Sequence, residues 1–174
     1  MKRRLGVVVL PCVLAALFAL PAAPAGAQTL GTCTALKGVT ISPGITAKLS
    51  SGTFKSTAGG TFICAGTVHR KPVAGAGSVS FAGTYGHPIG DNCLQGKGGG
   101  SIIGTVPVVR GGSVTISGSF VFVRVGAAVT AVGVLSGPIV FVAELAFAPK
   151  LGQNCVTKPV TAATVAGPAL LAGL

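Results

Sequence analysis

The densest group of chemically active side chains lies between Tyr85 and Cys93, in the sequence Tyr-Gly-His-Pro-Ile-Gly-Asp-Asn-Cys. His87 and Asp91 share this segment, and a serine from elsewhere would complete a hydrolytic triad. No Gly-x-Ser-x-Gly turn, which exposes the nucleophile in many hydrolases, accompanies them. Asp and Asn are also common turn residues, because their side chains bind nearby backbone N–H groups. We therefore expect a turn without catalytic function, and a hydrolase that uses the His87/Asp91 loop is kept as an alternative.

A second group, His69-Arg70-Lys71, is the densest cluster of basic residues after residue 27. It is a candidate anion-contact loop, and the alternative is a solvated hairpin tip, because loops are exposed in any case. The segment Gly96–Gly100 resembles a phosphate-binding loop only in its glycine content, since it lacks the Gly-Lys-Ser/Thr ending. We expect a flexible connection there.

The cysteines indicate disulfides rather than a metal site. The cysteines after residue 27 are widely spaced and form no Cys-x-x-Cys pair: Cys33, Cys64, Cys93 and Cys155. An even number of cysteines in an exported chain is typical of a disulfide framework. We expect two disulfides and favour the pairing Cys33–Cys64 with Cys93–Cys155, while the other two pairings stay open. No metal or cofactor is predicted.

Export is predicted from the N-terminus. Basic residues at 2–4 precede an apolar run from Leu5 to Leu20, and Ala25-Gly26-Ala27 fits a signal-peptidase site. We expect residues 1–27 to be a secretory signal peptide, and the protein to be secreted, extracellular or associated with the cell envelope. Residues 28–160 are then a single domain, and residues 161–174 an apolar C-terminal tail that packs on the domain or frays.

The charge of the exported chain is strongly positive. Of the 13 Lys and Arg residues, ten follow residue 27, and the only acids are Asp91 and Glu144, so the net charge is +8. The basic residues are scattered and have almost no aromatic residues among them, which argues against nucleic-acid binding. The charge serves solubility, or it attracts the protein to an anionic envelope polymer or a membrane surface.

Period-two alternation of apolar and small polar residues predicts strands at 78–85, 113–122 and 139–147. A recurring nine-residue pattern beginning at Gly60, Gly77 and Gly112 supports this prediction, and its internal glycines suggest bulges or close approach of a facing sheet. Further strands are expected at 36–41, 45–50, 101–109, 127–136 and 154–161. The uncharged run from Val125 to Ala143 is interrupted by glycines and by Ser136-Gly137-Pro138, so it predicts two strands and a turn rather than a membrane helix.

These patterns predict an all-β fold: an antiparallel β-sandwich, Ig-like or Greek-key in type, with roughly 7–9 strands and two disulfides. A small β-barrel is the alternative. We expect an exported, non-enzymatic domain that binds, or has a structural role, at the cell envelope or in the extracellular space. A small-molecule carrier is the alternative function, with an apolar cleft lined by residues such as Phe120 and Phe122.

Overall fold

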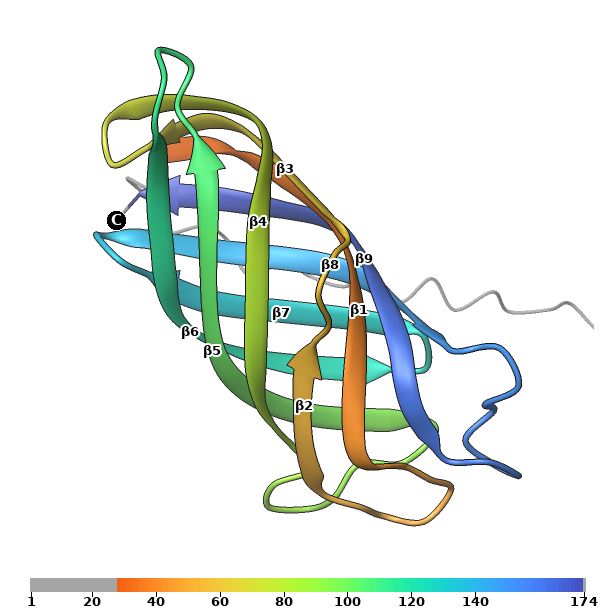
Figure 1. Cartoon of the computed structure of the whole chain (residues 1–174). Helices are drawn as coiled ribbons and strands as arrows, with labels where there is room; N and C mark the ends of the chain where they lie inside the picture. The colour runs from red at the N-terminus through yellow and green to blue at the C-terminus, as the bar shows by residue number, and fades with distance from the viewer. Residues whose placement is uncertain (1–27, 174) are drawn as a thin grey trace, which may run out of the picture.

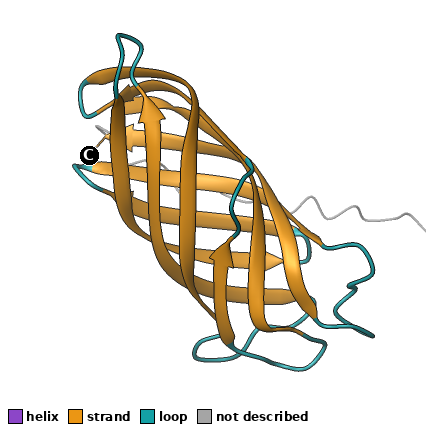
Figure 2. Ribbon diagram, in the orientation of Figure 1, coloured by secondary structure: helices purple, strands orange, loops and turns teal. Residues whose placement is uncertain are grey.

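The computed structural model describes residues 28–173, which form strands joined by turns and loops and contain no helix (Figures 1 and 2). This arrangement confirms the predicted all-β class. The predicted signal peptide, residues 1–27, lies outside the described residues. The strands are β1 (Gln28–Ile45), β2 (Gly52–Ser56), β3 (Thr61–Val68), β4 (Lys71–Tyr85), β5 (Gln95–Pro107), β6 (Ser113–Val125), β7 (Ala128–Leu135), β8 (Ile139–Pro149) and β9 (Val160–Gly173).

All the strands belong to one antiparallel sheet whose order returns to its start. Each strand from β3 to β8 pairs with the strand that follows it in the chain, and β1 pairs with both β3 and β9. In the β1–β9 pair, Gln28 lies opposite Gly173 and Thr40 opposite Ala162. The sheet is therefore a ring, and Figure 1 shows β7 and β8 passing behind β4 and β5.

Strands β2 and β3 share one place in the ring, between β1 and β4. β3 pairs with residues 31–36 of β1, and β2 pairs with residues 39–42. The two strands divide β4 in the same way. Lys37 lies at the break between them, where its buried side chain donates a hydrogen bond to the Gly59 carbonyl.

Alternate side chains point into the ring, as the period-two patterns predict. In β4, Val79 and Tyr85 are buried, whereas Ser78 and Ser80 are exposed. In β6, Ile116 is likewise buried between two exposed neighbours, and more buried and less buried side chains alternate along β8. Full burial of such an aliphatic side chain stabilises the fold by about 1.5–3 kcal/mol, so the inward face provides the main driving force for ring formation.

Two internal glycines of the recurring pattern allow neighbouring backbones to approach closely. A Cβ atom on Gly83 would lie 2.1 Å from the Gly99 carbonyl oxygen, and one on Gly118 would lie 2.0 Å from the Val134 carbonyl oxygen. Any larger residue would force these strands apart. The close partner is the adjacent strand of the same sheet, not a facing sheet as expected.

Four segments differ from the sequence-based expectations. Residues 161–173, expected to be a tail, belong to β9, because their small apolar side chains alternate and fill the seam between β8 and β1. The expected connection Gly96–Gly100 lies within β5. The segments 45–50 and 154–161 are mostly loop, and their turn-forming side chains bind their own backbone, as Asn154 does. The expected pair of strands within 127–147 is present as β7 and β8.

Two disulfides tie the sheet together, as predicted. Cys33 and Cys64 are directly opposite each other on β1 and β3 and are bonded. Cys93 is bonded to Cys155, which joins the loop before β5 to the loop before β9. This is the pairing favoured from the sequence.

Candidate functional site: an apolar cavity inside the ring

The inward-facing side chains of the ring line a cavity of about 160 Å³ whose wall is apolar. All nine strands contribute side chains to the wall. Every phenylalanine among the described residues lines the cavity: Phe54, Phe62, Phe81, Phe120, Phe122, Phe141 and Phe147. Phe120 and Phe122, the residues expected to line a carrier cleft, are therefore part of the wall.

Four of these rings form a cluster around Phe54, which the short strand β2 places in the interior. The Phe54 ring centroid lies 5.6 Å from that of Phe122 in an edge-on arrangement, 6.2 Å from Phe120 and 6.3 Å from Phe81. Phe81 and Phe120 are also edge-on, at 6.3 Å. Such arrangements suit the ring quadrupoles. All four side chains are only partly buried although they point inward, so the cavity leaves part of each ring uncovered.

Glycines of β5 make room for these rings. Gly98 and Gly100 lie opposite Phe122 and Phe120 in the pairing with β6. A Cβ atom on Gly98 would lie 2.7 Å from the Phe122 ring and 2.2 Å from the Thr84 carbonyl oxygen. The glycine run therefore shapes the interior and is not a flexible connection.

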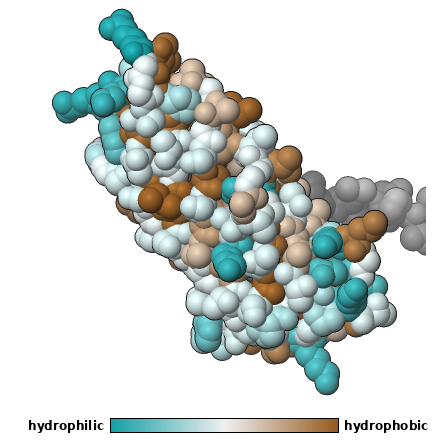
Figure 3. All heavy atoms as spheres, viewed as in Figure 1, coloured by the Kyte–Doolittle hydropathy of each residue, from teal (hydrophilic) through white to brown (hydrophobic). Residues whose placement is uncertain are grey.

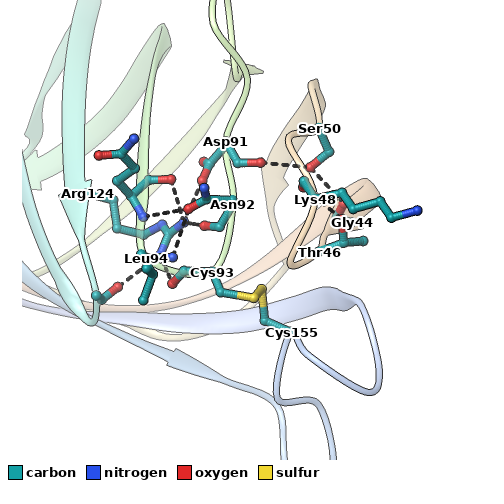
Figure 4. A network of polar contacts seen from close by, with 12 residues as sticks. Gly44, Thr46, Lys48, Ser50, Asp91, Asn92, Cys93, Leu94, Arg124 and Cys155 are labelled. Carbon is teal, nitrogen blue, oxygen red and sulfur yellow. Dashed lines mark hydrogen bonds and ion pairs between the residues drawn. A yellow bond between two sulfur atoms is a disulfide. The ribbon is translucent and has the colours of Figure 1, made fainter.

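A buried ion pair lines one end of the cavity, and Figure 4 shows its contacts. Arg124, 3 % exposed, follows Phe122 by two residues on the inward face of β6, and it meets Asp91, 1 % exposed, from the loop after β4. The Arg124 Nη2 atom lies 2.5 Å from the Asp91 Oδ1 atom. Gly96 leaves space for this carboxylate, because a Cβ atom there would overlap it.

The Arg124 guanidinium also joins the loop to the β6–β7 turn. It donates hydrogen bonds to the carbonyl oxygens of Cys93 at 3.2 Å, Gly126 at 2.9 Å and Gln95 at 3.3 Å, and to that of Asn92. Its carbon Cζ lies 5.4 Å from the centre of the Phe147 ring. Its Nε atom is buried and has no hydrogen-bond partner within the described part of the chain.

The environment changes the acidity of two groups at this end. Burial raises the pKa of the Asp91 carboxyl above its ordinary value, against the opposing effects of Arg124 and of the Asn92 N–H. Burial also raises the pKa of the Tyr85 phenol, whose oxygen accepts a hydrogen bond from the Gly44 N–H at 3.3 Å. Neither group is a free acid or base facing solvent.

The residues of the hydrolase alternative are not brought together as a catalytic group. The Asp91 carboxylate binds Arg124, whereas the His87 side chain is exposed. No hydrogen bond links His87 to Asp91 in the described structure. Ser50 contacts only the backbone of Asp91 and not its carboxylate: its Oγ atom donates a hydrogen bond to the Asp91 carbonyl oxygen at 3.2 Å, and the two backbones exchange hydrogen bonds.

The candidate anion-contact loop is a tight turn between β3 and β4. His69 and Arg70 have positive φ angles of 49° and 62°, as a two-residue hairpin turn requires. The His69 Nε2 atom lies 2.6 Å from the Ser136 carbonyl oxygen in the β7–β8 turn. Arg70 and Lys71 are exposed to solvent.

Metal-ligand clusters and membrane-spanning helices are absent from residues 28–173. No group of three or more His, Cys, Asp or Glu side chains is placed to hold a metal ion there. None of that segment is a helix with the length and apolar character needed to cross a membrane.

Sequence reasoning missed Arg124, although a signal was present. The inward series of β6 runs from Val114 through Ile116 and Gly118 to Phe120 and Phe122, and one further step reaches Arg124. A basic residue on an apolar face needs a buried acceptor, and the chain has only two acids.

Comparison of the chain with protein-family models, with curated proteins and with solved structures finds no match.

Proposed function

We propose that this protein is a non-enzymatic carrier that holds one small apolar molecule inside the ring of strands. The supporting observation is the cavity of about 160 Å³ with its apolar wall. Protein interiors are normally packed with few voids larger than a water molecule. An apolar cavity of about 150 Å³ in another protein stays dry and binds benzene, so the volume suits a hydrocarbon of about that size.

The finer architecture belongs to the same proposal. The ring has eight places, because β2 and β3 share one, and we assign it as a small closed β-barrel rather than two packed sheets. Barrels of about eight strands have an interior just large enough to be filled by side chains or to hold one small ligand. The carrier acts outside the cytoplasm, since intramolecular disulfides are typical of secreted proteins.

Ligand recognition would rest on shape and apolar contact. The wall offers aromatic edges and faces from the four-phenylalanine cluster, which pack well against a flat hydrocarbon. The Asp91 carboxylate and the Arg124 Nη atoms at the end of the cavity are already paired, and the Arg124 Nε atom, which has no partner among the described residues, has almost no surface exposed to the cavity. We therefore expect benzene or toluene to bind and a charged analogue such as benzoate to be rejected, because its carboxylate would lose hydration without gaining a partner.

The test is ligand-dependent thermal stabilisation of the oxidised protein. A ligand at a hundred times its Kd stabilises the folded state by about 2.7 kcal/mol, which raises the Tm of a domain of this size by roughly 5–10 °C. Toluene should produce this shift and benzoate should not.

Two alanines of β8 provide matched variants. Ala143 is buried and lines the cavity, whereas Ala146 is exposed. Ala143→Leu should fill much of the cavity and remove the toluene shift, and Ala146→Leu should retain it. If Ala143→Leu does not fold, titration of the wild-type protein with hydrocarbons of increasing size tests whether binding occurs in the cavity. A site bounded by the cavity wall must reject the larger hydrocarbons. Equal shifts for both leucine variants, or no shift with any small hydrocarbon, would overturn the proposal.

A further inference from the structure

Three long connections lie at the same end of the ring. They are the loops 46–51 between β1 and β2, 86–94 between β4 and β5, and 150–159 between β8 and β9. Ser50 and Asp91 exchange backbone hydrogen bonds of 2.8 and 2.7 Å, and the Cys93–Cys155 disulfide joins the second and third loops. Together they form one connected surface, which we call the loop end (lower right in Figure 1).

Large apolar side chains project into solvent from all three loops. Leu151 is 99 % exposed, Leu94 75 % and Val156 72 %, and Leu49 and Ile89 are also more than half exposed. Among the described residues, the turns at the opposite end expose one large apolar side chain of this kind, Val109. Exposed aliphatic side chains gathered on several loops are typical of a contact surface.

Lysines accompany these apolar side chains. Lys48 precedes Leu49 and Lys150 precedes Leu151 in sequence, and Lys158 lies in the same loop as Val156; all three lysines are exposed. The two acids of the chain do not balance them. Asp91 is buried against Arg124, and Glu144 points outward from β8, five residues before its end at Pro149, or roughly 16 Å along the strand.

We propose that the loop end docks on an anionic phospholipid bilayer. The exposed Leu, Ile and Val side chains enter the headgroup region, and the lysines bind the phosphates, as in other proteins that lie on membrane surfaces. A second copy of the chain is a poor occupant, because it would bring like charges together. A soluble polyanion would satisfy the lysines but would leave the apolar side chains in water. Figure 3 shows apolar and polar surface side by side toward this end.

The experiment is flotation of the exported, oxidised protein with vesicles of phosphatidylcholine, with and without phosphatidylglycerol. The opposite end supplies a charge-matched control. Lys48→Gln/Lys150→Gln/Lys158→Gln and Arg70→Gln/Lys71→Gln/Arg110→Gln remove three exposed charges each. A basic residue near an anionic surface strengthens binding about fivefold, so the lysine variant should bind anionic vesicles roughly 100-fold more weakly. The control variant should bind within a few fold of wild type.

A second pair of variants tests the apolar contribution. Leu49→Ser/Leu151→Ser should weaken binding about tenfold, because two aliphatic side chains no longer enter the bilayer. Ile103→Ser/Val121→Ser, which alters exposed residues on the outside of the sheet, should have little effect. The proposal is overturned by equal losses in the two charge variants, by unchanged binding of the leucine variant, or by failure of the wild-type protein to prefer anionic vesicles. It concerns a surface distinct from the cavity, so its failure would leave the carrier proposal standing.

Discussion

Replacing Arg124 by methionine should destabilise the protein strongly and in a pH-dependent way. Methionine keeps much of the apolar stem but removes every guanidinium hydrogen bond, including the contact of 2.5 Å to Asp91. The Asp91 carboxylate, 1 % exposed, then has no cationic partner, and the carbonyl oxygens of Cys93 and Gly126 lose their donor. Breaking a buried ion pair by removing one partner costs about 3–5 kcal/mol.

Urea unfolding with the disulfides intact measures this loss. With a slope of roughly 1.5 kcal/mol per molar urea, the unfolding midpoint should fall by about 2–3 M at neutral pH. Arg110→Met is the control, because Arg110 is exposed in the β5–β6 turn, and it should change the free energy of unfolding by less than about 0.5 kcal/mol.

The pH dependence identifies the cause. Burial already raises the pKa of Asp91 above its unfolded value, and loss of Arg124 should raise it further. The folded state then binds a proton more tightly than the unfolded state, so stability falls as the pH rises between the unfolded pKa and the folded pKa. The loss caused by Arg124→Met should therefore be smaller near pH 4 than at pH 7, and Asp91→Asn/Arg124→Met should show little pH dependence. A loss as small as that of the control, or one that grows toward acid pH, would refute the reasoning.

Three further predictions follow from the cavity wall and the loop end. Burial raises the pKa of Tyr85, the only tyrosine, above its ordinary value of 10.0, so tyrosinate absorbance should appear only above that pH. The free energy of unfolding of the wild-type protein should also fall as the pH rises from about 10 to the raised pKa, and that of Tyr85→Phe should not. Gly98→Ala should lower the free energy of unfolding by about 1–3 kcal/mol, since its Cβ atom would press on the Phe122 ring and on backbone; an unchanged urea midpoint would contradict this. Cys93→Ser/Cys155→Ser removes a link across 62 residues and should cost about 4 kcal/mol by the chain-entropy estimate, because the unfolded chain is no longer constrained. The same urea titration measures this loss, and a value below about 1 kcal/mol would contradict the estimate.

Local patterns predicted the strands well where large and small residues alternate strictly. The inward series containing Val79 and Phe81, and the one containing Ile139 and Phe141, lie as expected, because a period of two fixes which side chains share a face. Sequence reasoning failed for Gly96–Gly100, since runs of glycine mark loops far more often than they make room for large side chains within a strand. Side chains from elsewhere in the chain explain three of these glycines: Phe122 and Phe120 lie opposite Gly98 and Gly100, and the Asp91 carboxylate lies against Gly96.

The site depended on contacts that no local pattern contains. The pairing of β1 with β9 joins residues more than a hundred positions apart in the chain, so closure of the sheet could not be read from any window of sequence. The Asp91–Arg124 pair likewise links a loop to a distant strand. The cysteine spacing did give correct long-range information, because an oxidised even set must pair within the chain.

Because β1 and β9 are neighbours, the first strand of the domain cannot complete its backbone pairing until the last strand is available. Until residues 160–173 have been added to the chain and have paired, β1 and β8 each expose a row of unpaired N–H and C=O groups, and such rows readily recruit other chains. Contacts so distant in sequence also form slowly. The interval between the synthesis of β1 and the pairing of β9 is thus the period in which this protein is most prone to aggregation, and a chaperone that shields strand edges would have its greatest effect then.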